Sequence, residues 1–140
     1  MKFIPTLLAC FAVAHAQRVA IGSPPDQAMV SAGQQMVVEV DRPNFLSSAQ
    51  EVSVVIGIQS CAATPCAAPN RMMGQILYSG GFDPQPDAKN TSKPPHQNFT
   101  VTLPSNLQKG SAQIGVAHFS LIGAGLEPFM ETKNVSVIVQ

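Results

Sequence analysis

The chain has 140 residues, of which 45% are hydrophobic and 11% charged, with 8 basic and 8 acidic residues and no formal net charge. A chain of this length forms one small domain. Because it is neutral and contains no run of Lys or Arg, it lacks the positive field needed to bind nucleic acid or an anionic membrane surface. We therefore expect no nucleic-acid partner.

Residues 1–16 are typical of a secretory signal peptide. Lys2 precedes an apolar run, and small residues suited to signal peptidase follow. The run is shorter than the ~20 residues that span a bilayer. Cleavage fits after Ala14 or after Ala16, and we favour Ala16 because it leaves a polar spacer. We expect a secreted, extracellular protein without membrane insertion, whose single domain comprises residues 17–140.

Cleavage after Ala14 would instead place His15 at the N-terminus, where its amine and imidazole are copper ligands. His96 or His118 would then complete a histidine brace of the kind that oxidative copper enzymes use. No acidic or tyrosine ligand with a recognisable spacing accompanies them. The sequence favours a solvated His96 in a loop and a hydrogen-bonded His118 in a strand, and we expect no metal and no cofactor.

Alternation of apolar and polar residues, typical of half-buried strands, begins directly after the signal peptide. It predicts a short strand over Arg18–Ile21 and a longer one over Gln35–Asp41. Glu39 and Asp41 share the polar face of the second strand. We interpret them as solvated charges, and no other pair of closely spaced carboxylates occurs.

The next strand is predicted over Glu51–Gln59, and its apolar residues share one face. They are Val52, Val54, Ile56 and Ile58. Cys61 and Cys66 follow it, and in an oxidising compartment they should pair once Cys10 leaves with the signal peptide. The five-residue spacing matches neither a thioredoxin-like site nor a zinc site, so we expect a disulfide that staples a loop.

The second half of the chain contains one long loop and further strands. A strand is predicted over Gln75–Tyr78, and the Pro-rich stretch from Asp83 to His96 predicts a mobile surface loop. Two more alternating strands contain Phe99, Val101 and Leu103, and then Val135, Val137 and Val139. Between them, Ala112–Ile122 is apolar on both faces, as in a central strand.

Two features of this half could carry function. Leu126 and Phe129, near glycines, form either an exposed apolar tip or a tucked-in connection. Three sequons, at Asn90, Asn98 and Asn134, predict N-glycosylation if their side chains are exposed.

No window predicts a helix, because β-branched residues dominate the apolar runs and Pro or Gly interrupts most stretches of ten residues. The predicted fold is all-β: an antiparallel two-sheet sandwich of immunoglobulin-like or fibronectin-like type. An up-and-down barrel is the structural alternative. No motif of a hydrolase or metalloenzyme occurs, so we expect no enzyme.

Two sequence pieces are more specific than the strand pattern: V-E-V-D-R-P at residues 38–43 and H-F-S-L-I-G-A-G at residues 118–125. With the opening R-V-A-I-G-S-P-P at residues 18–25 and the terminal N-V-S-V at residues 134–137, they occur in an order that resembles the necrosis-inducing secreted protein family of fungal effectors. The resemblance covers nearly the whole mature chain, and it transfers no catalytic residue.

This resemblance implies a small secreted β-sandwich effector from a plant-associated fungus. Its expected partners are host proteins, namely immune receptor-like kinases, whose binding suppresses pattern-triggered immunity and at high dose causes cell death. Entry into the host cell and a monomeric state are part of this expectation. The alternative is an extracellular carbohydrate-binding or wall-binding module without catalytic activity. A single tyrosine, Tyr78, and the absence of Trp weaken that alternative, because sugar platforms usually rely on aromatic faces.

Overall fold

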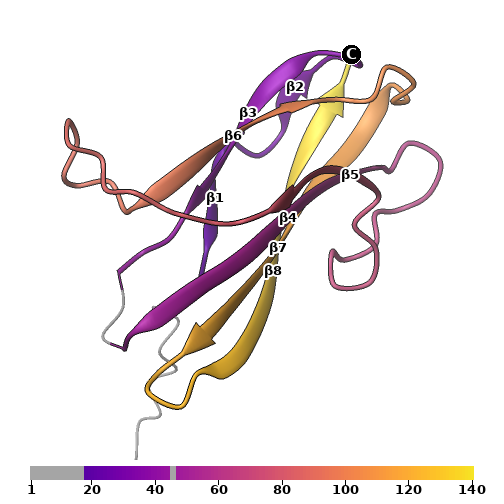
Figure 1. The fold of residues 1–140 in the computed structure, drawn as a ribbon. Coiled ribbons are helices and arrows are strands. Elements are labelled where there is room, and N and C mark those ends of the chain that lie inside the picture. The colour runs from indigo at the N-terminus through magenta and orange to yellow at the C-terminus, as the bar shows by residue number, and fades with distance from the viewer. Residues whose placement is uncertain (1–17, 45–46) are drawn as a thin grey trace, which may run out of the picture.

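The computed structural model describes residues 18–44 and 47–140, and these form strands, turns and loops (Figure 1). The eight strands are β1 (Ala20–Ser23), β2 (Ala28–Val30), β3 (Gln35–Asp41), β4 (Ala49–Ser60), β5 (Gln75–Gly80), β6 (His96–Thr102), β7 (Gly110–Ile122) and β8 (Glu127–Val139). In this part of the chain no helix is long and apolar enough to cross a membrane. The predicted signal peptide, both cleavage positions and His15 lie outside the described residues.

The eight strands form two sheets, and their order is immunoglobulin-like. One sheet has three strands, in the order β1-β3-β6, and the other has five, in the order β2-β8-β7-β4-β5. The triplets β1-β3-β6 and β4-β7-β8 correspond to the A-B-E and C-F-G strands of immunoglobulin-like sandwiches. The predicted all-β sandwich is therefore confirmed, and the two separate sheets exclude the up-and-down barrel among the described residues.

One strand pair departs from the predicted antiparallel arrangement. β1 pairs antiparallel with β3, whereas β2 pairs parallel with β8 at the edge of the other sheet. Pro24 and Pro25 separate β1 from β2, and proline cannot continue a strand ladder. The chain therefore leaves the first sheet at the prolines and crosses to the second. The sequence did not predict the three-residue strand β2.

The core lies between the two sheets and consists of the inward residues that the alternation predicted. Val38 and Val40 of β3 and Phe99 and Val101 of β6 face the second sheet, and all four are buried. β7 is buried on both faces over its first half, as predicted for a central strand.

A β-bulge in β4 overturns one part of the predicted pattern. The register between β4 and β7 shifts between Glu51 and Ser53, so that two residues of β4 oppose Ser120. Val54, Ile56 and Ile58 point inward as predicted, but Val52 is 39% exposed. The bulge reverses the alternation and turns Glu51 toward the interior in place of Val52.

The loop after β4, residues 61–74, folds back onto the outer face of the five-stranded sheet. It contains the predicted disulfide between Cys61 and Cys66, with Cα atoms 5.0 Å apart. Gly57 and Gly115 face each other on β4 and β7, and a Cβ atom at Gly57 would lie only 2.4 Å from the Met73 carbonyl oxygen. The two glycines therefore provide the space in which this disulfide loop packs.

Two glutamine side chains fasten the disulfide loop to the sheet. The amide nitrogens of Gln59 and Gln113 donate to the Ala67 carbonyl oxygen at 2.7 and 2.9 Å. The Asn134 side chain in turn donates to Gln113 Oε1 at 3.1 Å. The disulfide is thus one of several local contacts that shape this loop.

The Pro-rich loop lies on the opposite side of the sandwich (Figure 1). The sequence predicted a mobile segment, but contacts hold both ends. Gln85 and His96 exchange two backbone hydrogen bonds, and the Asp83 backbone N–H donates to Gln97 Oε1 at 2.7 Å. His96, predicted in the loop, is the first residue of β6.

Candidate functional site

A cluster of charged side chains lies between the sheets at the level of His118. The His118 side chain is fully buried, and its Nδ1 atom lies 3.2 Å from Glu131 Oε1 while its Nε2 atom is hydrogen-bonded to Glu51 Oε2. Glu51 also accepts a hydrogen bond from Arg42 Nε at 2.6 Å. The backbone N–H of Val19 donates to Glu131 Oε1 at 2.9 Å. This buried charge cluster joins β4, β7 and β8 to the start of β1 and the end of β3.

The protonation of the cluster follows from its hydrogen bonds. A carboxylate can only accept, so both ring nitrogens of His118 carry hydrogen and the ring is an imidazolium. Burial alone would lower the pKa of His118, but the hydrogen bonds to Glu131 and Glu51 outweigh it and raise the pKa above the ordinary value. Partial burial would raise the pKa of Glu51, but the hydrogen bonds from His118 and Arg42 lower it. Two positive groups thus balance two carboxylates.

The two specific sequence pieces meet in this cluster. Arg42 belongs to V-E-V-D-R-P and His118 to H-F-S-L-I-G-A-G, and both contact Glu51. The ring of Phe82 covers His118 in an edge-on arrangement, with ring centroids 5.3 Å apart. A fully buried imidazole cannot reach a substrate, so these residues hold the sandwich together at the end of the three-stranded sheet.

The sequence predicted that Glu39 and Asp41 are solvated charges; this is wrong for Glu39, and Asp41 is partly buried. Glu39 is only 8% exposed, and Lys93 from the Pro-rich loop lies over it with Nζ 2.6 Å from Glu39 Oε2. Partial burial and the neighbouring Glu39 carboxylate raise the pKa of Asp41. A Cβ atom at Gly22 would collide with both carboxylates. The long-range contact with Lys93, 54 residues away, is what a local pattern could not reveal.

His96 and His118, the two alternative partners of His15 in the hypothetical copper brace, lie in separate surroundings. His118 is enclosed by the buried charge cluster, whereas His96 lies beside the Pro94 carbonyl oxygen and 3.9 Å from Glu39. His15 lies outside the described residues. Within residues 18–44 and 47–140, no group of three or more His, Cys, Asp or Glu side chains is arranged to hold a metal ion.

The three sequon asparagines are exposed, as glycosylation requires. Asn90 lies in the Pro-rich loop. Asn98 lies on the outer face of the three-stranded sheet, and Asn134 on the outer face of the five-stranded sheet. The acceptor positions therefore lie on both faces of the sandwich.

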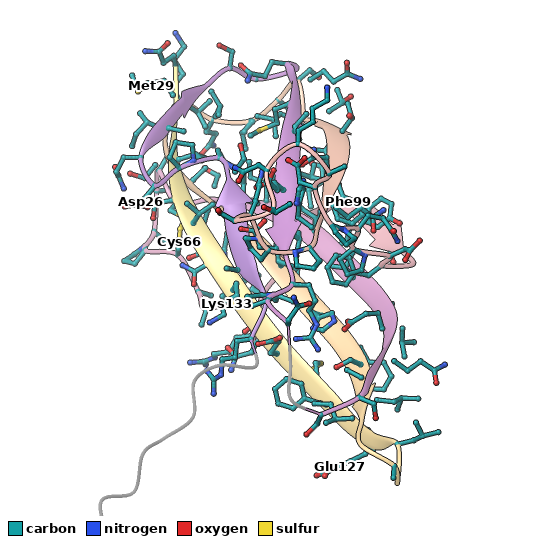
Figure 2. The ribbon with its side chains drawn as sticks, turned by 90° about the vertical axis from the view of Figure 1, so that its left-hand side faces the viewer. Asp26, Met29, Cys66, Phe99, Glu127 and Lys133 are labelled. Atoms are coloured by element: carbon teal, nitrogen blue, oxygen red, sulfur yellow. A yellow bond between two sulfur atoms is a disulfide. The ribbon has the colours of Figure 1, made fainter. Side chains whose placement is uncertain are left out.

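An uncharged apolar surface lies on the outer face of the five-stranded sheet, where β4, β7 and β8 run beyond the start of β1 (Figures 1 and 2). Three cross-strand rows compose it, and each residue in them is uncharged. The rows are Val55–Ala117–Thr132, Ser53–Phe119–Met130 and Gln50–Leu121–Pro128. Met130 is 68% exposed, and Val52 in the bulge lies at its border. We call these rows the arm face.

The predicted tip adjoins the arm face. Leu126, in the turn between β7 and β8, is half exposed, whereas Phe129 points to the inner side and is partly buried. The sequence allowed either an exposed tip or a tucked-in connection. In the structure Leu126 is exposed, as in the first alternative, and Phe129 is tucked in, as in the second. Glu127 marks this end of the molecule in Figure 2.

The Nis1 family model matches residues 14–138, which is nearly the whole chain. The chain belongs to the Nis1 family. This membership confirms the resemblance to secreted fungal effectors that the two specific sequence pieces indicated. In this Nis1 family member, those pieces supply Arg42 and His118 to the interior, and the second piece also contributes Phe119 and Leu121 to the arm face.

The structure is similar to a solved structure described as Clostridium thermocellum CbhA fibronectin(III)-like modules, with a TM-score of 0.44 and 10% sequence identity. That match covers 88% of this chain and 97% of the other. No curated protein matches the chain.

Sequence reasoning missed the arm face and the buried charge cluster for related reasons. Phe119 lies in a stretch that is apolar on both faces, and Met130 lies between Pro128 and Glu131, which interrupt the apolar pattern of β8. Neither segment shows the alternation that assigns a side chain to one face. Only pairing with β7 places their side chains side by side. Val52 was the one sequence signal for this surface. The alternation assigned its side chain to the interior, and the bulge exposes it.

Proposed function

We propose that this Nis1 family member is a secreted effector that acts by binding a host protein, without catalysis. Family membership supports the effector role. Plant immune receptor-like kinases are the proposed partners, and binding would suppress pattern-triggered immunity and at high dose induce cell death. Action on a kinase inside the host requires that the secreted protein enters the host cell.

The arm face is the observation that carries the binding proposal. Cores of protein interfaces are depleted of charged residues and enriched in aromatic side chains and methionine. The arm face has Phe119 and Met130 in one row and no charged residue in any of its three rows. A contiguous uncharged sheet surface of this kind favours a protein partner.

The carbohydrate-binding alternative lacks an aromatic platform at its one tyrosine. The ring of Tyr78 packs against Phe99 with centroids 4.6 Å apart, and its hydroxyl donates to the Gly81 carbonyl oxygen. These contacts tie the ring to the core residue Phe99 and to the chain after β5, which disfavours its use as a sugar platform. Sedimentation with wall polysaccharides tests the carbohydrate-binding alternative, as described below.

The test compares two single substitutions in pull-downs of plant receptor-like kinase domains by the mature chain. Met130→Lys places a charge at the centre of the arm face and should weaken binding at least ~10-fold, because a lysine would be desolvated there. Met29→Lys is the matched control, since Met29 is 58% exposed on β2 at the sheet edge. It should bind like the original chain.

Two results would contradict the proposal. The first is absence of binding to every kinase domain in the panel. The second is equal binding by Met130→Lys and Met29→Lys, which would remove the arm face from the interaction. Sedimentation of the chain with chitin or β-glucan, without any kinase binding, would favour the wall-binding alternative.

A further inference from the structure

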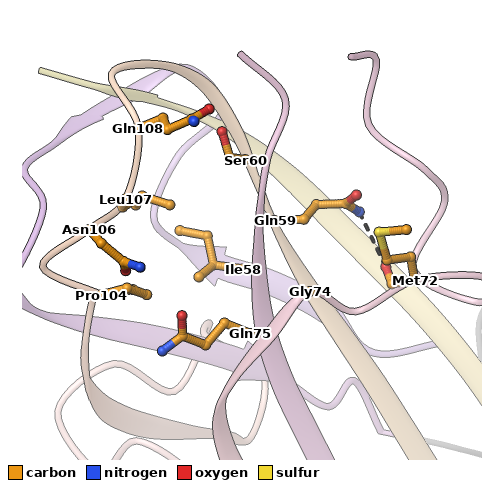
Figure 3. A pocket seen from close by; sticks show the side chains of 10 residues that line it. All are labelled: Ile58, Gln59, Ser60, Met72, Gly74, Gln75, Pro104, Asn106, Leu107 and Gln108. Carbon is orange, nitrogen blue, oxygen red and sulfur yellow. Dashed lines mark hydrogen bonds between the residues drawn. The ribbon is translucent and has the colours of Figure 1, made fainter. Parts of the chain in front are cut away.

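A cleft of about 420 Å³ opens at the other end of the five-stranded sheet, next to the start of β5 (Figure 3). Its apolar floor consists of Ile58, Pro104 and Leu107. Figure 3 shows Ile58 and Gln75 across from the segment that carries Pro104, Asn106 and Leu107. The cleft therefore lies between the end of β4 with the start of β5 and the connection from β6 to β7.

Primary amides surround this apolar floor. Gln59 is engaged, because its amide nitrogen donates to the Ala67 and Met72 carbonyl oxygens at 2.7 and 3.2 Å. Gln75, Asn106 and Gln108 are exposed and make no side-chain hydrogen bond to other described residues. The cleft thus offers three unengaged amides and no charged side chain. We call it the amide cleft.

The chemistry of the amide cleft suits a peptide backbone. A side-chain amide has two donors and an acceptor, so it can pair with the N–H and C=O groups of an extended chain. β5 is the last strand of its sheet, and its far edge adds backbone groups of the same kind. An apolar floor below these groups leaves room for an uncharged side chain.

The irregularity of β5 decides between a short peptide and a second copy of this chain. The register between β4 and β5 shifts at Leu77, where β5 carries one extra residue. A bulge of this kind hinders long edge-to-edge pairing between two flat strands. Antiparallel pairing of two β5 strands would also place Gly80 opposite Gln75, and a glycine has no side chain to fill the cleft.

We propose that the amide cleft binds a short extended peptide segment with uncharged side chains, supplied by a partner protein. Asn106, Gln108 and Gln75 pair with the backbone of the segment, and one side chain of the segment rests on Ile58 and Leu107. This site is separate from the arm face and does not depend on it.

The experiment selects linear 12-residue peptides from a phage-displayed library on the immobilised secreted chain and measures their affinity by fluorescence anisotropy. The Asn106→Asp/Gln108→Glu variant keeps side-chain volume but adds charge and removes donors, so it should bind the selected peptides at least ~10-fold more weakly. Gln27→Glu is the matched control, because it makes the same change at an exposed glutamine between β1 and β2, outside both the amide cleft and the arm face. It should bind within about twofold of the original chain.

Backbone amide spectra should show peptide-induced changes at residues 74–76 and 105–108. The proposal is overturned if the library returns no peptide that binds above background, or if Gln27→Glu loses as much affinity as the cleft variant. It is also overturned if chitin or glucan hexamers perturb the cleft and peptides do not, or if the chain forms a dimer through β5. Met130→Lys should leave peptide binding intact, so failure of the arm-face proposal remains distinguishable.

Discussion

His118 shows how a single residue can organise the interior of a small sandwich. A buried ion pair stabilises only if its remaining polar atoms find partners. Here each ring nitrogen of His118 meets a carboxylate and Glu51 is shared with Arg42, whereas the buried Glu131 Oε2 atom has no hydrogen-bond partner among the described residues. The sequence predicted a hydrogen-bonded strand histidine and was right about its setting, but it did not predict either partner.

The charge on His118 makes stability depend on pH. Since the folded state raises the pKa of His118 above its ordinary value of 6.5, the stabilisation is complete below pH 6.5 and is lost as the pH rises through the folded-state pKa. We expect the melting temperature to fall as the pH is raised above 6.5 into the alkaline range. Calorimetry of the original chain across this range is the measurement.

Glu51→Gln identifies the source of this pH dependence. It removes one carboxylate from His118, so the loss of stability should begin at a lower pH than in the original chain, because less negative charge holds the proton. The titration of Glu51 itself lies at lower pH and does not disturb the comparison. A melting temperature that stays constant above pH 6.5 in the original chain would show that His118 is not charged in the folded state.

Among the elements, β4 has inward-facing residues that the sequence predicted and a bulge that it did not predict. Its alternation correctly placed Val54, Ile56 and Ile58 inside. The bulge near Glu51 could not be predicted, because Val52 continues the apolar pattern and gives no local reason for a register shift. The contacts of the partly buried Glu51 with His118 and Arg42 account for the bulged arrangement, and those partners come from outside β4.

The packing of the disulfide loop on β4 and β7 depends on glycine. Gly57→Ala should destabilise the domain by about 1–3 kcal/mol, because the added methyl overlaps the Met73 carbonyl and forces the loop outward. Urea unfolding measures the cost, and limited proteolysis at residues 61–74 reports loosening of the loop. Gly125→Ala is the matched control, since a Cβ atom there meets nothing within 4 Å. Equal stability of the two variants would mean that the loop does not depend on this contact.

At the scale of the whole molecule, acceptor asparagines and binding surfaces have different locations. Asn90 and Asn98 lie on the side of the three-stranded sheet, and Asn134 lies beside the disulfide loop. Neither the rows of the arm face nor the lining of the amide cleft includes an acceptor asparagine. Asn134 nevertheless shares the outer face with the arm face and lies two residues along β8 from Thr132, so a glycan there would border the arm face. Glycans at Asn90 and Asn98 would leave both surfaces available.

Intact mass spectrometry of chain produced through a fungal secretory pathway tests the processing. We expect three N-glycans and, after their enzymatic removal, a chain that begins at Gln17. An N-linked amide keeps one hydrogen, so a glycan on Asn134 is compatible with its bond to Gln113. Asn90→Gln, Asn98→Gln and Asn134→Gln should each remove the mass of one glycan. A mass unchanged by glycosidase would contradict the predicted glycosylation, and a chain starting at His15 would revive the copper hypothesis.

The sequence by itself determined the all-β sandwich, the family, the pairing of Cys61 with Cys66 and most of the inward-facing apolar residues. These features follow from the period of alternation, short motifs and turn residues, all of which are local. Only the tertiary structure decided that Glu51 turns toward the interior and that Glu39 is buried. It also decided that Phe119 and Met130 form one surface, and that Asn106 and Gln75 face one cleft. A polar side chain can be buried only when its partners arrive from distant strands, and alternation within one strand carries no information about those partners.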